Sequence, residues 1–138
     1  MRCGVKPDMD EQVKYWIELA DYDLDTARVM LNTGRYLYVG FMCHQVVEKM
    51  LKAYYAATTG EIPPFTHNIE LLARKSGLDC DFSQDQLDFV RQLEPLNVQS
   101  RYPTDRELLI QSLTETKCRR IFDQTTEIHK WINQKLSN

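Results

Sequence analysis

Apolar residues recur every three or four positions along most of this chain, and this helical period constrains its fold more than any other feature. One continuous apolar stripe runs from Met9 to Leu31, at Val13, Trp16, Ile17, Ala20, Leu24, Ala27 and Leu31. A second run with the same period extends from Tyr36 to Thr58, before Gly60 and two prolines that cannot continue a helix. We therefore expect two long helices, over about 9–31 and 36–58.

Helix start signals predict the elements that follow. Thr66 is a candidate N-cap for a short helix over about 68–76, which Gly77 would end. The pattern Ser83-x-x-Gln86 is that of a capping box, and it predicts a fourth helix that ends near Pro95.

Two more capping-box patterns lie downstream, beginning at Thr104 and at Ser112. We expect a brief helical turn after the first, a long last helix after the second, and an irregular segment over 96–103. No stretch alternates between apolar and polar residues as a strand would. The sequence thus predicts an all-α fold, a compact up-and-down bundle of about five helices. We expect residues 1–138 to form one domain, with its core over about 10–136.

Charge excludes several classes of partner. The 138 residues carry a formal charge of −3, which does not fit a strongly cationic nucleic-acid coat or a polybasic membrane anchor. The charge is uneven, because residues 1–25 and 79–94 each sum to −4, whereas 26–78 sum to +3 and 95–138 to +2. No stretch is apolar enough to cross a membrane, and residues 1–8 lack the apolar core of a secretory signal.

The four cysteines are about 40 residues apart and form no C-x-x-C pair, which disfavours zinc and redox sites. We expect reduced thiols and a cytoplasmic location. No Gly-rich turn is present to hold phosphates, and no H-E-x-x-H or E-x-x-H motif is present to bind metal. Cys43 and His44 are adjacent, so they point about 100° apart on a helix and cannot act as nucleophile and base for each other. We predict no catalytic residue, no metal and no cofactor.

The polar face of the second predicted helix is one candidate site. Gln45, Lys49 and Lys52 lie on one side of it and could donate several hydrogen bonds to a phosphate or a partner chain, with His44 beside them. The alternative is a solvated face, in which His44 meets Glu48 at the surface, four residues on.

The segment 97–105 is the second candidate. Arg101 pairs readily with phosphate, and Tyr102 can stack on a base. The alternative is an ordered connection in which Tyr102 packs and Arg101 pairs with the end of a helix. If the fold brings 44–53 and 100–103 together, an acidic chain would hold one local basic site.

In order and spacing, these pieces resemble the HEPN domain family (higher eukaryotes and prokaryotes nucleotide-binding). The resemblance covers about residues 10–136. It rests on a first helix with Trp16, Ala20, Asp23, Leu24 and Ala27, then Gly-Arg-Tyr at 34–36, His-Gln-Val-Val-Glu-Lys-Met-Leu-Lys-Ala at 44–53, Pro-Phe-Thr-His-Asn at 64–68, Leu-Asn at 96–97 and Ser-Arg-Tyr-Pro at 100–103.

The resemblance implies a helical bundle that forms a homodimer, often beside a minimal nucleotidyltransferase in toxin–antitoxin pairs. Many members are metal-independent ribonucleases with an R-x(4–6)-H motif, in which the histidine does the acid–base work. That motif is absent here, because no arginine stands at the required distance before His44, His67 or His129.

We therefore expect a homodimeric binding module for a nucleotide, an RNA phosphate or a nucleotidyltransferase partner, acting through His44, Gln45, Lys49, Lys52, Arg101 and Tyr102. We expect His67 to position the third helix rather than to react. One alternative is a ribonuclease toxin in which His44 or His67 replaces the missing group, and another is a purely structural dimerisation subunit.

Overall fold

The computed structural model describes residues 9–97 and 103–137, and these form helices and connections without a strand. The elements are α1 (Met9–Asn32), α2 (Tyr36–Thr59), α3 (Ile69–Ser76), the 3-10 helix η1 (Leu78–Asp81), α4 (Gln84–Leu93), the 3-10 helix η2 (Glu94–Leu96), α5 (Pro103–Ser112) and α6 (Glu115–Ser137). The all-α bundle predicted from the sequence is confirmed.

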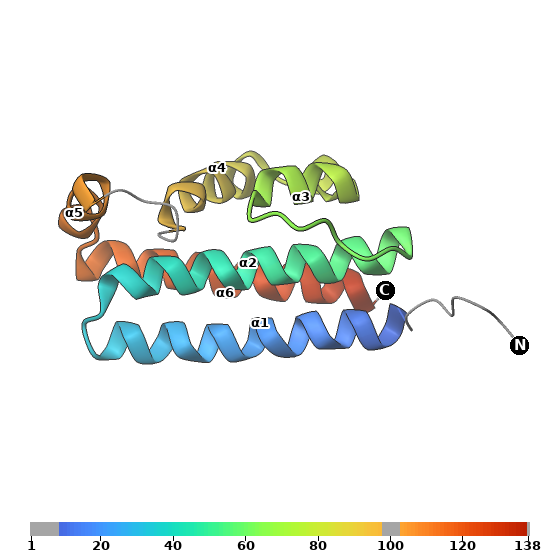
Figure 1. The fold of residues 1–138 in the computed structure, drawn as a ribbon, viewed down its shortest axis with the longest axis horizontal. Helices are drawn as coiled ribbons and strands as arrows, with labels where there is room; N and C mark the ends of the chain where they lie inside the picture. Colours follow the sequence, from blue (N-terminus) through green and yellow to red (C-terminus); the bar gives the residue numbers. More distant parts are fainter. Residues whose placement is uncertain (1–8, 98–102, 138) are drawn as a thin grey trace, which may run out of the picture.

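The three long helices α1, α2 and α6 run alongside one another, and α3 and α4 lie on the opposite side of α2 from α1 (Figure 1). Helix α2 is central, with fourteen of its 24 residues buried. Its apolar side packs against the predicted stripe of α1 and against Cys118, Ile121, Ile128 and Ile132 of α6. Helix α5 lies at one end of the bundle (Figure 1).

Glycines end two of the helices as the sequence predicts. Gly60 follows α2 and Gly77 follows α3, both with positive φ (71° and 82°), a conformation that other residues adopt at a cost. Gly40 has a different role, inside α2. A Cβ atom there would lie 3.2 Å from Leu96 Cδ1, so the missing side chain lets η2 approach the helix closely.

Three predictions about helix starts are wrong. Asn68, and not Thr66, caps α3, because its side chain accepts a hydrogen bond from Leu71 N (2.9 Å). Helix α6 is capped by Thr114, which accepts from Lys117 N (3.2 Å), whereas Ser112 donates to a carbonyl of α5.

The third wrong prediction is the brief helical turn expected after Thr104. The structure has a ten-residue helix there, α5. It begins at Pro103, whose fixed φ suits the first position of a helix and whose missing N–H is not needed there. The capping box at Ser83 is confirmed, with both of its hydrogen bonds present.

The described cysteines are unpaired, as predicted for Cys43, Cys80 and Cys118; Cys3 lies outside the described residues. Burial raises the pKa of Cys43 to about 12 and that of Cys118 to about 11, so both remain thiols at neutral pH. Neither is therefore an activated nucleophile. Among the described residues, no helix has the length and apolar content needed to cross a membrane.

Candidate functional site: a buried polar network on α2

Four polar side chains of α2 are buried within the bundle. His44 is 0% exposed, Gln45 9%, Glu48 3% and Lys52 7%. The solvated face considered from the sequence, with a surface contact between His44 and Glu48, is therefore wrong. Residues of α1 and the segment before α3 cover them: the Trp16 ring lies over Lys52, and His67 contacts Glu48.

Glu48 is the centre of this network. Its Oε2 accepts a hydrogen bond from Lys52 Nζ (3.0 Å), and its Oε1 lies 2.9 Å from Nδ1 of His67. The Lys52 ammonium also lies 5.2 Å from the centroid of the Trp16 ring on α1, within the range of a cation–π contact. One buried carboxylate thus joins α2 to the segment that precedes α3.

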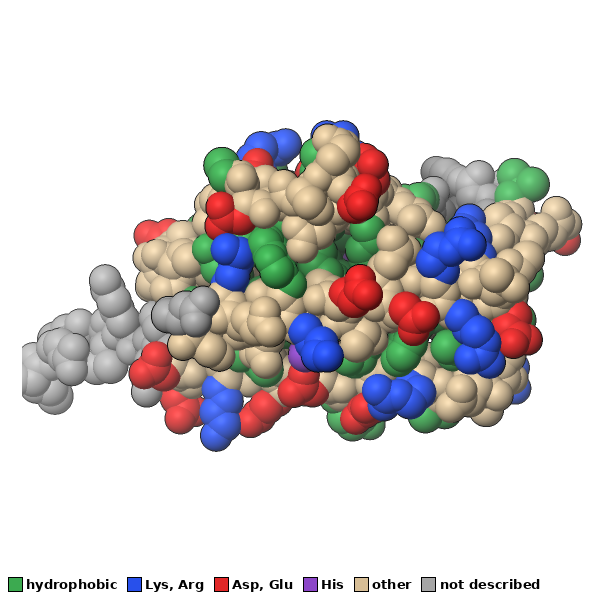
Figure 2. Space-filling model, turned by 180° about the vertical axis from the view of Figure 1, so that it is seen from behind, with side chains coloured by type: hydrophobic (Ala, Val, Ile, Leu, Met, Phe, Trp, Pro, Cys, Tyr) green, Lys and Arg blue, Asp and Glu red, His purple; other side chains and the backbone are tan. Residues whose placement is uncertain are grey.

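Lys49, the other lysine of this polar side of α2, is also paired with a carboxylate. Lys49 Nζ lies 2.6 Å from Asp23 Oδ2 of α1 and donates to Gln45 Oε1 (3.0 Å). Each predicted lysine therefore has its own carboxylate, and 44–53 does not carry the free positive charge expected for a local basic site. On the face seen in Figure 2, basic side chains are likewise interspersed with acidic ones.

His44 lies deeper than the rest. Its Nδ1 is 3.9 Å from Glu48 Oε1 and its Nε2 is 3.9 Å from Glu94 Oε2, beyond hydrogen-bond distance. Burial lowers the pKa of His44 to about 4, although the Glu48 carboxylate favours the charged form. His44 is therefore neutral at pH 7 and closed to solvent, which makes it unfit to bind a phosphate or to exchange protons with a substrate.

The entry to α3 is held by three further hydrogen bonds. Glu94 Oε1 accepts hydrogen bonds from the backbone N–H groups of Ile69 (2.7 Å) and Glu70 (3.1 Å), where a carboxylate is favoured by the helix dipole. Thr66 Oγ1 accepts from Asn68 N (3.1 Å). The backbone that follows His67 is thus fixed.

The model of the HEPN domain family matches residues 13–135, from the first turns of α1 almost to the end of α6. The chain belongs to the HEPN domain family. The resemblance found in the sequence is confirmed, and the polar network of α2 lies within the matched residues.

Two solved structures share this HEPN fold. The protein TT1696 from Thermus thermophilus has a TM-score of 0.77 at 22% identity, over 90% of this chain and 98% of that one. ST0689, an archaeal HEPN homologue, has a TM-score of 0.63 at 20% identity, over 90% and 97%. No curated protein sequence matches the chain.

The sequence-predicted site residues have three different outcomes in this HEPN domain. Gln45, Lys49 and Lys52 lie together, but both lysines are engaged with carboxylates, and His44 is enclosed. Arg101 and Tyr102 lie outside the described residues. Within residues 9–97 and 103–137, no three His, Cys, Asp or Glu side chains are grouped as metal ligands.

His67 is the accessible end of the network, with 58% of its side chain exposed. A carboxylate only accepts hydrogen bonds, so the contact with Glu48 places a proton on Nδ1 and leaves Nε2 on the far side of the ring. The sequence indicated His67 through the Thr-His-Asn run. It gave no signal for the Glu48 partner, which lies 19 residues earlier in the chain.

Proposed function

We propose that this HEPN domain is a binding module that forms a homodimer and binds a phosphate group, of a nucleotide or an RNA, at His67. The observation that supports the phosphate site is the 2.9 Å contact between the buried Glu48 and the exposed His67. It holds an imidazole in one orientation and one tautomer at the surface, with Nε2 directed away from the carboxylate.

The burial of the network supports a role beyond stability. Taking both members of an ion pair out of water is costly, and apolar residues of similar volume often stabilise a fold equally well. Glu48 and Lys52 nevertheless have side chains only 4% and 9% exposed. We infer that the role of the pair is to fix Glu48, which in turn fixes His67.

Calorimetric titration with ATP, GTP and a short RNA tests the phosphate site. We expect at least one of these ligands to bind, and His67→Ala to weaken that binding about tenfold or more, as loss of a charge-assisted hydrogen bond does. His129→Ala is the matched control, because His129 also contacts a carboxylate (Asp21 Oδ1, 2.7 Å) but lies on α6. Equal loss in both variants, or no loss in His67→Ala, would contradict the proposal.

A ribonuclease is the second candidate, and the same contact favours it. A carboxylate that orients an exposed imidazole is an arrangement used in general acid–base catalysis. Of the two histidines considered as substitutes, the enclosed His44 is excluded by its burial, which leaves His67. Cleavage of tRNA or mRNA without metal, lost in both His67→Ala and Arg101→Ala, would favour the ribonuclease over the binding module.

The partners can be tested separately. Light scattering after size exclusion is expected to give the mass of a homodimer. A nucleotidyltransferase encoded next to this chain, and its co-purification with it, would support a toxin–antitoxin type of pair. A dimer that binds none of the three ligands would instead favour a purely structural dimerisation subunit.

A further inference from the structure

The connection between α2 and α3, residues 60–68, leaves two large apolar side chains exposed to water (Figure 1). Ile62 is 55% exposed, and Phe65 is 103% exposed, more than any other large apolar residue that the structure describes. Among the same residues, the Phe65 ring belongs neither to the hydrophobic core nor to an aromatic pair. A buried phenylalanine adds one of the largest apolar areas to a core, so the fold itself makes no use of this ring.

The residues on either side of Phe65 are nevertheless restrained. Pro63 is buried and Pro64 half-buried, and their rings fix φ just before Phe65. On the other side, Thr66 Oγ1 accepts a hydrogen bond from the backbone N–H two residues on (3.1 Å), and the buried carboxylate of α2 holds the His67 ring (2.9 Å). The Phe65 ring therefore projects from an ordered segment, which lowers the entropy lost when a ligand binds to it.

The position of this ring relative to His67 matters most. Two residues span at most about 7 Å of chain, so the phenyl ring of Phe65 and the imidazole of His67 start from nearby backbone atoms. In a nucleotide, the ribose separates the base from the 5′-phosphate by a similar length. One nucleotide can therefore reach both side chains.

A nucleobase suits the exposed ring better than other groups do. Any base can stack on an aromatic side chain through its π-face. A base is uncharged at neutral pH, so the acidic Glu61 of the same connection does not repel it. A purely apolar partner would need a wider apolar surface, whereas the three residues after Phe65 are all polar.

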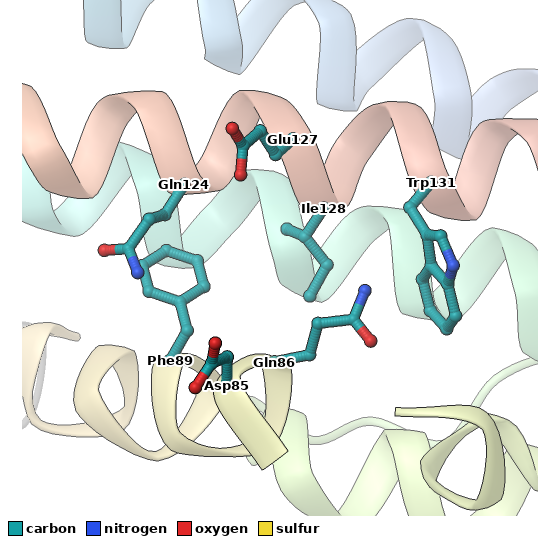
Figure 3. Close-up of a pocket in the computed structure, with 7 residues that line it drawn as sticks. All are labelled: Asp85, Gln86, Phe89, Gln124, Glu127, Ile128 and Trp131. Carbon is teal, nitrogen blue, oxygen red and sulfur yellow. The ribbon is translucent and has the colours of Figure 1, made fainter. Parts of the chain in front are cut away.

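The pocket between α4 and α6 lacks this combination of groups (Figure 3). Its volume is about 270 Å³, but its charged lining residues are Asp85 and Glu127, and no lysine or arginine is among the residues that line it. Phe89, also in the lining, is only 4% exposed, so its ring is closed to a base. A nucleotide phosphate would be repelled there by both carboxylates.

We propose that Phe65 stacks on the base of the nucleotide or RNA residue whose phosphate binds at His67. This inference rests on the proposed function, and it names the ligand as one that carries a base rather than a bare phosphate or a phosphorylated protein. Stacking recognises a π-face and not a pattern of hydrogen bonds, so adenine and guanine are expected to bind about equally well.

A matched pair of ligands tests the proposal on the whole chain. Adenosine 5′-monophosphate (AMP) and ribose 5-phosphate share the sugar and the phosphate and differ in the base. In calorimetric titration we expect AMP to bind about tenfold more tightly, since one base–aromatic stack contributes roughly that much. In NMR spectra, the ring current of Phe65 is expected to move the adenine proton resonances upfield as AMP binds.

Variants of Phe65 then locate the stack. Phe65→Ala is expected to remove the upfield shift and to lower the affinity for AMP to that for ribose 5-phosphate. Phe65→Leu is expected to do the same, because leucine is apolar but has no π-face, whereas Phe65→Tyr is expected to bind AMP normally. Tyr22→Ala is the control, because Tyr22 is an aromatic residue of α1 that is 73% exposed. None of these variants is expected to change the melting temperature, since neither ring belongs to the core.

The possible outcomes separate the stack from the phosphate site. Equal affinity for AMP and ribose 5-phosphate, full affinity for AMP in Phe65→Ala, or an equal loss in Tyr22→Ala would overturn the stacking on Phe65. If His67→Ala weakens both ligands and Phe65→Ala weakens neither, only the stacking is wrong. If Phe65→Ala weakens AMP and His67→Ala weakens neither ligand, the phosphate site is wrong and the link between the two residues falls with it. A chain that binds neither AMP nor RNA would overturn both.

Discussion

Replacing Glu48 with glutamine removes the charge at the centre of the network while keeping its volume. The carboxylate serves two donors, Lys52 Nζ at 3.0 Å and His67 Nδ1 at 2.9 Å. A glutamine has one acceptor oxygen, and its NH₂ group would face the other donor. Breaking one partner of a buried ion pair typically costs about 3–5 kcal/mol. Since the Trp16 ring still faces the ammonium, we expect about 3 kcal/mol less stability for Glu48→Gln.

A double-mutant cycle in urea, followed by circular dichroism, separates this effect from a change in packing. Lys52→Met removes the ammonium, so the amide oxygen of a Glu48→Gln/Lys52→Met chain can serve His67 alone. We expect the double variant to regain most of the loss, with a coupling energy of about 2 kcal/mol or more.

The exposed pair Lys14–Glu18 is the matched control. It has the same i,i+4 spacing, a distance of 3.9 Å and side chains 72% and 66% exposed. Its coupling is expected to stay below about 0.5 kcal/mol. If Glu48 and Lys52 were coupled no more strongly than this pair, the reasoning about the buried network would be refuted.

Three further predictions concern the bundle around the site. His44 has a pKa of about 4 when folded and near 6.5 when unfolded, so the unfolded chain binds more protons between these values. The contribution of the neutral His44 side chain to the free energy of unfolding is therefore fully present above pH 6.5, and it falls by roughly 3 kcal/mol as the pH drops to 4. We expect urea unfolding of His44→Asn, measured above pH 6.5 and at pH 4, to lack this fall. Gly40→Val is expected to lower stability by about 1–3 kcal/mol, because the added side chain meets Leu96; an unchanged urea midpoint would contradict the close packing. Ser83→Ala is expected to cost about 1 kcal/mol, whereas Ser112→Ala, outside any cap, should change the melting temperature little; equal effects would contradict the capping assignment.

The three long helices could be predicted because each has an apolar stripe that only a helix gathers on one side. The caps were harder, since Thr66, Asn68, Ser112 and Thr114 are all suitable residues within a few positions of a helix start. Which one accepts the hydrogen bond depends on where the backbone first turns, and tertiary packing decides that.

The site could be predicted only in part. Helical spacing alone places Gln45, Lys49 and Lys52 on one side of α2, and the structure agrees. Their burial could not be predicted, because a polar side of a helix usually faces water. Their partners are also remote in sequence: Asp23 lies on α1, and His67 precedes α3. The pocket between α4 and α6 is harder still, because it exists only through the relative placement of two helices.

The most direct test of the central claim, that Glu48 holds His67 as the phosphate-binding group, is the nitrogen NMR spectrum of the His67 ring during a titration with ATP. We predict a protonated Nδ1 in the free chain, and a change at Nε2 that saturates as ATP binds and that is lost in Glu48→Met/Lys52→Met, in which position 48 has no acceptor left for Nδ1. A ring that populates both tautomers equally, or an Nε2 resonance that ignores a bound nucleotide, would contradict the account.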